Sequence, residues 1–109
     1  MERLMIKIGT RYLFVKVNEI DWIEADRNYL RIHKGENSYL VRQTLKGIEK
    51  KLDSDKFIRI NRSTIINVER IKELRTEKYS KYVVVMDDNN TWCWGRRFRN
   101  NLLRFIAVN

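Results

Sequence analysis

Apolar residues in this chain occur in short stretches that alternate with polar residues and end at turn-forming residues. Leu4, Ile6 and Ile8 follow this pattern, and Gly9 comes directly after them. A period of two places every second side chain on the same face of a β-strand, whereas a helix requires apolar residues three and four positions apart. The pattern therefore predicts a chain of short strands joined by tight turns.

The same strand pattern returns along most of the chain, and turn-forming residues separate the stretches. The predicted strands are Leu4–Ile8, Tyr12–Val17, Ile20–Ala25, Tyr29–His33, Ser38–Arg42, Phe57–Ile60, Ile71–Leu74, Tyr82–Met86 and Thr91–Trp94. Many short strands in succession favour antiparallel pairing between neighbours along the chain.

The spacing becomes helical in two places. Leu45, Ile48 and Leu52 share one helix face after Thr44, whose hydroxyl group suits the N-cap position. They predict one internal amphipathic helix of about two to three turns. A C-terminal helix is predicted from Phe98, Leu102, Phe105 and Ile106. We therefore expect residues 1–109 to form a single domain of mostly β class, with small antiparallel sheets, one internal amphipathic helix and a C-terminal helix.

The charge balance indicates the kind of partner. The chain has 23 Lys and Arg residues against 14 Asp and Glu residues, which gives a net charge of +9 and a pI near 9.9. So large an excess favours a polyanionic partner, although a merely basic, solvated surface is the alternative. No apolar stretch approaches the ~18 residues of a membrane-spanning helix, and the N-terminus lacks the apolar run of a secretory signal. A location in the cytoplasm, without membrane contact, is expected.

No cluster of residues predicts catalysis, a metal site or a cofactor. The chain has neither a glycine-rich phosphate loop nor a nucleophile elbow. Its one cysteine, Cys93, lies between two tryptophans and is interpreted as a small packing residue, and its only histidine, His33, as a structural or surface residue. Asp87, Asp88 and Glu24 leave a metal-dependent nuclease as a distant alternative, but a DDNN sequence is first of all a turn. The chain is therefore not expected to be an enzyme.

Three segments concentrate basic and hydrogen-bonding side chains at predicted strand ends. We call them loop 1 (Asp26–Tyr29), loop 2 (Arg59–Ser63) and loop 3 (Gly95–Arg99). Arginine can bind phosphate or guanine through two parallel hydrogen bonds, and asparagine can pair with adenine. Arg96 and Arg97 precede a predicted helix, where cations oppose the helix dipole unless an anion neutralises them. Each loop alone is compatible with an ordinary turn or a solvated surface, but together they favour a nucleic acid as partner.

Loop 2 lies within the segment FIRINRSTIIN, Phe57–Asn67, which opens and closes like a buried strand. One interpretation is that its polar groups leave the sheet and are satisfied by a nucleic acid. The alternative is that acids or carbonyl groups elsewhere in the protein satisfy them. Asn67 follows two isoleucines and is expected to make a buried structural hydrogen bond. The polar residues that interrupt the apolar pattern, with no acid inside the segment to pair them, are Arg59, Asn61, Arg62 and Ser63.

The order of these motifs resembles that of the LytTR family of bacterial DNA-binding domains. The matching phrases are IDWIEADRNYLRIH, YLVRQTLKGIEKKL, FIRINRSTIINVERI and GRRFRNNL, which together span nearly the whole chain. The third phrase is the most specific, because it is close to the family block F-x-R-h-x-R-S-x-h-h-N-h-x-x-I, where h is an apolar residue. The resemblance implies small antiparallel sheets with short helices, and loops that enter successive major grooves on one face of bent duplex DNA.

The resemblance also implies roles for individual residues by motif position. Asn28, Arg62 and Arg97, one from each loop, are implied to contact base edges. Phosphate or supporting contacts are implied for Arg27, Arg42, Lys46, Arg59, Asn61, Ser63, Arg96 and Arg99. The implied function is sequence-specific binding of double-stranded promoter DNA, commonly at direct repeats. Such binding would regulate transcription, with the chain as effector domain of a two-component response regulator.

Two departures from the family pattern affect these expectations. Gly95 stands where a capping serine is usual, so that helix cap and one phosphate contact are not expected from this residue. Family members usually carry a receiver or sensor domain as well. We therefore expect either a stand-alone regulator or part of a longer one, in which a receiver domain would promote homodimers on DNA.

A small basic RNA-binding module is the alternative function. Single-stranded RNA is recognised by aromatic side chains that stack on exposed bases from an open sheet face. This function requires the following aromatic residues to share one such face: Tyr29, Tyr39, Trp92 and Trp94.

Overall fold

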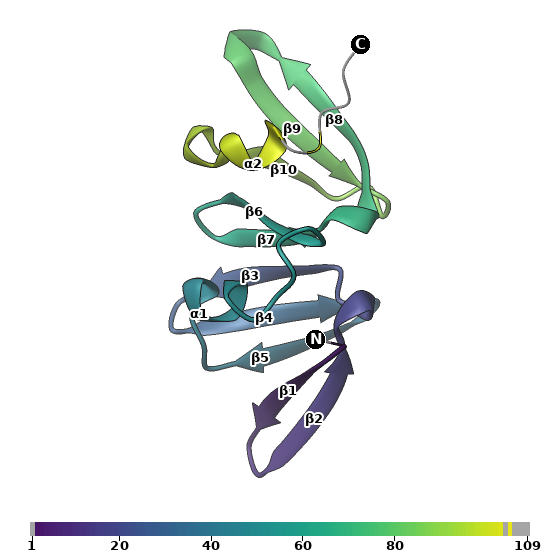
Figure 1. The fold of residues 1–109 in the computed structure, drawn as a ribbon, viewed down its shortest axis with the longest axis vertical. Helices are drawn as coiled ribbons and strands as arrows, with labels where there is room; N and C mark the ends of the chain where they lie inside the picture. Colours follow the sequence, from purple (N-terminus) through teal and green to yellow (C-terminus); the bar gives the residue numbers. More distant parts are fainter. Residues whose placement is uncertain (1, 104, 106–109) are drawn as a thin grey trace.

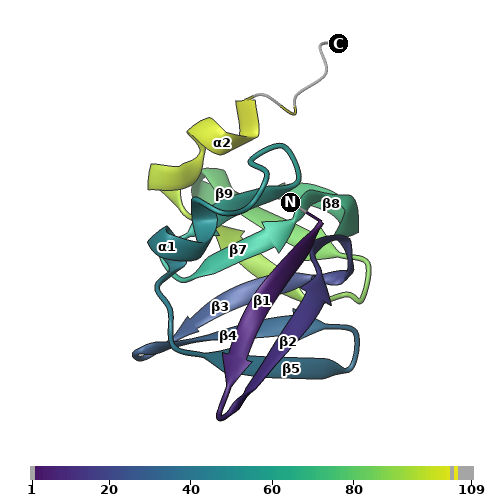
Figure 2. The same cartoon turned by 60° about the horizontal axis from the view of Figure 1, so that its bottom comes forward.

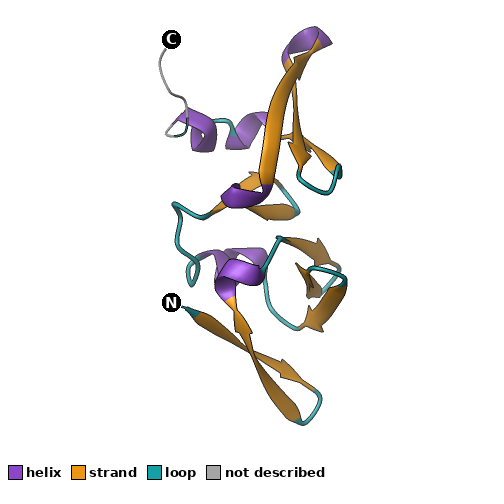
Figure 3. Ribbon diagram, turned by 90° about the vertical axis from the view of Figure 1, so that its right-hand side faces the viewer, coloured by secondary structure: helices purple, strands orange, loops and turns teal. Residues whose placement is uncertain are grey.

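The computed structural model describes residues 2–103 and residue 105, and it confirms a mostly β chain with small antiparallel sheets and two short helices (Figure 1). The elements are β1 (Arg3–Ile8), β2 (Arg11–Lys16), η1 (Val17–Glu19), β3 (Trp22–Asp26), β4 (Tyr29–Lys34), β5 (Asn37–Val41), α1 (Leu45–Glu49), β6 (Phe57–Asn61), β7 (Thr64–Asn67), η2 (Val68–Arg70), β8 (Ile71–Glu77), η3 (Lys78–Ser80), β9 (Lys81–Met86), β10 (Thr91–Trp94), η4 (Arg96–Phe98) and α2 (Asn100–Leu103). The η elements are single 3-10 turns. Figure 3 shows how small the helical share is among the strands.

The strands form three antiparallel sheets. The largest has the order β5–β4–β3–β7–β6, so that β7 pairs with β3 although three strands and α1 separate them in the sequence. The β1–β2 hairpin lies in front of β3, β4 and β5 when viewed from the lower end of the molecule (Figure 2). A third sheet, β10–β9–β8, packs against β6 and β7. These layers follow one another along an axis of 49 Å, compared with 27 and 25 Å in the other directions.

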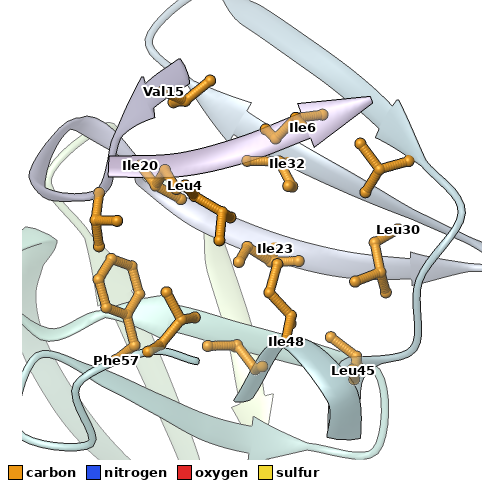
Figure 4. Close-up of a cluster of buried hydrophobic side chains, with 14 residues drawn as sticks. Leu4, Ile6, Val15, Ile20, Ile23, Leu30, Ile32, Leu45, Ile48 and Phe57 are labelled. Carbon is orange, nitrogen blue, oxygen red and sulfur yellow. The ribbon is translucent and has the colours of Figure 1, made fainter. Parts of the chain in front are cut away.

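Two hydrophobic clusters hold these layers together, and β7 contributes to both. Ile65 faces the cluster between the five-stranded sheet, the β1–β2 hairpin and α1, part of which Figure 4 shows. Ile66 faces the opposite way, into the cluster shared with Val84 and Trp94 of the third sheet. All four residues of β7 are buried. This position between two cores explains why two adjacent residues of β7, Ile65 and Ile66, are both apolar rather than alternating with polar residues.

The segment FIRINRSTIIN is a hairpin rather than one strand, because β6 and β7 pair on either side of a turn at Arg62 and Ser63. Asn67 is 1% exposed and makes the expected buried hydrogen bond, from its Nδ2 to the Ile20 carbonyl oxygen at 2.9 Å. Its Oδ1 also accepts from the Glu69 amide at 3.0 Å. One polar side chain therefore ties the end of β7 to the chain before β3.

The two helices are shorter than their apolar spacing predicts. Thr44 caps α1 as expected, since its Oγ1 accepts from the Gly47 amide at 2.9 Å. The helix ends at Glu49, but 3-10-type bonds continue the turn to Leu52, which is still buried against the core. At the C-terminal end, Phe98 lies in η4 and Leu102 in α2, and Ile106 lies outside the described residues.

The interpretation of Cys93 as a packing residue is wrong. Cys93 is exposed, because alternation along β10 turns the next residue, Trp94, into the core. The strand β8 also continues to Glu77, beyond the predicted end at Leu74. Among the described residues, no helix is long and apolar enough to span a membrane.

Candidate nucleic-acid interface

Loop 1 is the tight turn between β3 and β4. Asp26 pairs with Tyr29 across the hairpin, which leaves Arg27 and Asn28 as the two turn residues. Arg27 has a φ angle of 60°, in the left-handed region that is unfavourable for residues with a Cβ atom. Asp26 pairs with Arg31 at 3.3 Å. The side chains of Arg27 and Asn28 are exposed and have no hydrogen-bond or ion-pair partner among the described residues.

Loop 2 divides its polar residues into two groups. Arg59 and Asn61 belong to β6, and protein atoms satisfy them. The Arg59 Nε donates to the Asn61 carbonyl oxygen at 3.3 Å, and its Nη2 donates to the Arg62 carbonyl oxygen. The Arg59 guanidinium also lies 3.9 Å from Glu49. Asn61 Nδ2 donates to the Cys93 carbonyl oxygen at 3.3 Å. For these two residues the structure favours the alternative, in which carbonyl groups of the protein accept the hydrogen bonds.

The side chain of Asn61 fixes the turn of loop 2. Asn61 Oδ1 accepts from the amide and the hydroxyl group of Ser63, at 2.9 and 3.2 Å. Arg62 is exposed, and its guanidinium group has no partner in residues 2–103. The bonds that fix the turn therefore leave the Arg62 side chain free to bind something else.

Loop 3 begins at Gly95, where a Cβ atom would lie 3.3 Å from Phe98 Cδ2 and 3.5 Å from the Asn61 Cα. No side chain caps η4 at this position, as the glycine implies. Trp94 Nε1 instead donates to the Phe98 carbonyl oxygen at 2.8 Å, which closes the turn from the core side. Arg97 is exposed, and its side chain has no partner among the residues that the structure describes.

The other two arginines of loop 3 bind the tip of the β8–β9 hairpin. Arg96 Nη2 donates to the Tyr79 carbonyl oxygen at 3.1 Å, and Arg99 Nη2 donates to the Ser80 carbonyl oxygen. The Arg99 guanidinium also covers the ring of Tyr82, with 4.1 Å from Cζ to the ring centroid. Sequence reasoning had no means to predict this contact, because the acceptors are backbone carbonyl groups.

Backbone hydrogen bonds join the three loops in series. The Ala25 amide, next to loop 1, donates to the Ser63 carbonyl oxygen of loop 2 at 2.9 Å. The Gly95 amide of loop 3 donates to the Ile60 carbonyl oxygen of loop 2 at 2.7 Å. All three loops consequently lie along one edge of the molecule, on the left of Figure 1, in order along the long axis. The edge also includes α1.

A basic groove occupies this edge between loop 1, α1 and loop 2. It is an open depression of about 760 Å³, and none of its lining residues is acidic. Gln43 lines it too, although no sequence pattern singles out this residue. The cationic residues of the groove are Arg27, Arg42, Lys46, Arg59 and Arg62. Five cations without an acid among the lining residues make a site suited to a polyanion.

The residues of the nuclease alternative do not converge. Glu24 Oε1 lies 3.0 Å from His33 Nε2, and the His33 ring stacks on Trp22 with 3.6 Å between centroids, so His33 has the structural role expected for it. Asp88 accepts from the amide and side chain of Asn90 and closes the β9–β10 turn. Within the described part of the chain, no group of three or more His, Cys, Asp or Glu residues is placed to hold a metal ion.

The aromatic residues of the RNA alternative do not share an open face. Trp94 is buried, and Trp92 is half-buried against Trp22 in the second cluster. Tyr39 packs against the first cluster, in a different sheet. The face that this alternative requires is therefore absent from the described residues.

Residues 10–107 match a family model described as the LytTr DNA-binding domain. The chain belongs to the LytTR family. This LytTR chain is therefore a DNA-binding domain of a family that includes transcriptional regulators, and its membership confirms the expectation that it is not an enzyme.

Relatives and a solved structure agree with this assignment. The LytTR domain is 28% identical over 106 residues to the sensory transduction protein LytT of Bacillus subtilis, and 30% identical over 107 residues to the transcriptional regulatory protein LytR of Staphylococcus aureus. These matches cover 97% and 98% of this chain but 44% of each relative. The chain thus spans less than half the length of these curated relatives.

The fold also matches that of a solved LytTr DNA-binding domain from a Bacillus cereus response regulator. The TM-score is 0.81 at 22% sequence identity, and the match covers 94% of this chain and 98% of the other. At this identity the likeness supports the fold alone.

Proposed function

We propose that this LytTR domain binds duplex DNA sequence-specifically through the edge formed by loops 1, 2 and 3. The observation that carries the proposal is that three basic turns, far apart in the sequence, are joined by hydrogen bonds while each still presents an unpartnered side chain. These side chains are Asn28, Arg62 and Arg97. Amide and guanidinium groups pair with base edges in the major groove, and turns separated along an elongated molecule suit successive grooves of one duplex.

The remaining basic residues of the edge fall into two roles in this proposal. Arg27, Arg42 and Lys46 are exposed around the groove and bind phosphates. The Ser63 hydroxyl group already donates to Asn61 Oδ1, so it has a supporting role in the turn. The unfavourable backbone conformation of Arg27 supports a phosphate-binding role, because a glycine would fit that turn more easily but would present no cation. Supporting roles, in which the side chain shapes a loop, go to Arg59, Asn61, Arg96 and Arg99.

The biological setting follows from the family. We infer that the domain regulates transcription in the cytoplasm as the effector part of a response regulator, with two copies on direct repeats of promoter DNA. A receiver domain elsewhere in a longer chain would then control pairing of the copies. The lengths of LytT and LytR are compatible with such a partner domain.

Selection of bound duplexes from a random pool, followed by titration of the selected duplex over a salt series, tests this function. We expect a common sequence motif and a slope of log affinity against log salt of roughly −3, since three cations are assigned to phosphates and each neutralised phosphate contributes about −0.9. Single-stranded RNA should compete poorly. Equal binding to unselected duplexes, or stronger binding to the RNA, would contradict the proposal.

A further inference from the structure

The tip of the β8–β9 hairpin exposes side chains that the fold does not need. We use "the hairpin tip" for Lys78–Lys81. Tyr79 is 90% exposed, and both Tyr79 and Ser80 have positive φ angles, 65° and 58°. Glycine or asparagine would adopt this backbone with less strain. An aromatic ring held in solvent on an unfavourable backbone therefore indicates a role outside the core.

The hairpin tip is fixed to loop 3 of the DNA-binding edge. Arg96 and Arg99 donate to the carbonyl oxygens of Tyr79 and Ser80, and the Arg99 guanidinium stacks on Tyr82 at the start of β9. Arg96 is exposed and its guanidinium has five N–H donors, so this bond leaves donors of Arg96 available to a ligand. In Figure 1 the tip lies at the upper left, on the same side as the three loops and beyond loop 3 along the long axis.

The chemistry of the tip suits phosphate rather than base edges. Lys78 and Lys81 are exposed, and neither forms an ion pair among the described residues. Glu77 is the one acid at the base of the tip. Ammonium and phenol groups bind phosphate oxygens as donors, but they lack the paired donors and acceptors that distinguish one base pair from another.

We propose that the hairpin tip is a fourth DNA-contacting element, which binds phosphates of the duplex that flanks the sequence contacted by loop 3. This inference rests on the proposed function. Lys78 and Lys81 neutralise backbone phosphates there, and the Tyr79 side chain packs against the sugar-phosphate backbone with its hydroxyl group donating to phosphate. The tip adds affinity without sequence preference, and it lengthens the contacted stretch of DNA.

Two sets of variants and two duplexes test the tip. The first variant is Lys78→Gln with Lys81→Gln, and the second is Tyr79→Gly, which removes the ring and also relieves the positive φ angle. Lys16→Gln is the matched control, since Lys16 is an exposed lysine on the β1–β2 hairpin at the other end of the molecule. One duplex ends at the selected motif, and the other continues for about 10 base pairs, one helical turn, on each side.

On the extended duplex we expect the double lysine variant to lose roughly tenfold in affinity at low salt. Its slope of log affinity against log salt should be less steep than that of the wild type by about 2. Tyr79→Gly should lose several-fold, and its thermal unfolding midpoint should not fall. On the short duplex both variants should bind like the wild type, as Lys16→Gln should on either duplex. Equal losses on both duplexes, or no loss on the extended one, would overturn the tip as a flanking contact while leaving the proposed function intact. Wild-type protein that binds no selected duplex would overturn both.

Discussion

Replacing Arg62 with alanine is expected to weaken binding to the selected duplex by about 1–3 kcal/mol and to flatten the sequence preference at one position of the motif. Arg62 is exposed at the turn between β6 and β7, and its guanidinium group has no partner among the described residues. The turn itself depends on the Arg62 carbonyl group, which accepts from Arg59. Because alanine keeps that carbonyl group, the substitution should remove the contact without altering the loop.

Arg62→Lys separates charge from geometry. Lysine retains the positive charge but not the planar fork that donates two parallel hydrogen bonds to guanine. We expect this variant to keep the salt dependence of the wild type and to lose the sequence preference at that position of the motif. Titration against duplexes with single base-pair changes measures this preference. Lys16→Ala, which removes a cation from the β1–β2 hairpin, is the charge control. If Arg62→Ala binds every duplex as the wild type does, Arg62 does not contact bases.

Replacing Asn67 with alanine is expected to lower the free energy of unfolding by roughly 2–4 kcal/mol. The side chain is 1% exposed, and the substitution removes the hydrogen-bond partner of the buried Ile20 carbonyl oxygen and of the partly buried Glu69 amide. A buried polar group without a partner loses its hydration and gains nothing in return. The cost should therefore exceed that of the lost packing of the carboxamide group.

Urea denaturation of Asn67→Ala and of Asn18→Ala measures this effect. Asn18 is exposed in η1, so its substitution should change the free energy of unfolding by less than about 0.5 kcal/mol. DNA affinity measured well below the denaturation midpoint should be unchanged in both variants, because Asn67 lies away from the basic edge. A loss below 0.5 kcal/mol for Asn67→Ala would show that water or a local shift satisfies the two groups.

The sequence predicted most strands because alternation is a local property. Leu4, Ile6 and Val15 are buried where a period of two places them, whereas a short continuous apolar run locates β9. The order β5–β4–β3–β7–β6 was not predictable in this way, because the pairing of β3 with β7 joins residues about forty positions apart. The rule also misplaced Cys93, since the flanking tryptophans suggested burial, whereas alternation along β10 exposes the residue between them.

Composition and motif order selected the basic loops, and geometry then favours the supporting over the phosphate-binding role for some residues. Arg59 resembled a DNA contact because no acid accompanies it in the sequence, but backbone carbonyl groups of its own loop accept its hydrogen bonds. Arg96 and Arg99 are similar cases at loop 3. Carbonyl acceptors occur at every residue, so no sequence pattern marks the ones that a given arginine uses. For exposed residues such as Arg62, the contact with DNA inferred from the sequence stays a prediction.

The most direct measurement for the central claim is the change in backbone amide chemical shifts when the selected duplex is added to the whole chain. The account predicts large changes in loops 1, 2 and 3 and around Arg42–Lys46, which form one edge of the molecule. The β4–β5 turn at Gly35–Glu36 and the β9–β10 turn at Asp87–Asn90 lie at the other ends of their strands, away from that edge, and should change little. The largest changes at those two turns, or changes at only one of the three loops, would contradict the claim that a single duplex contacts all three together.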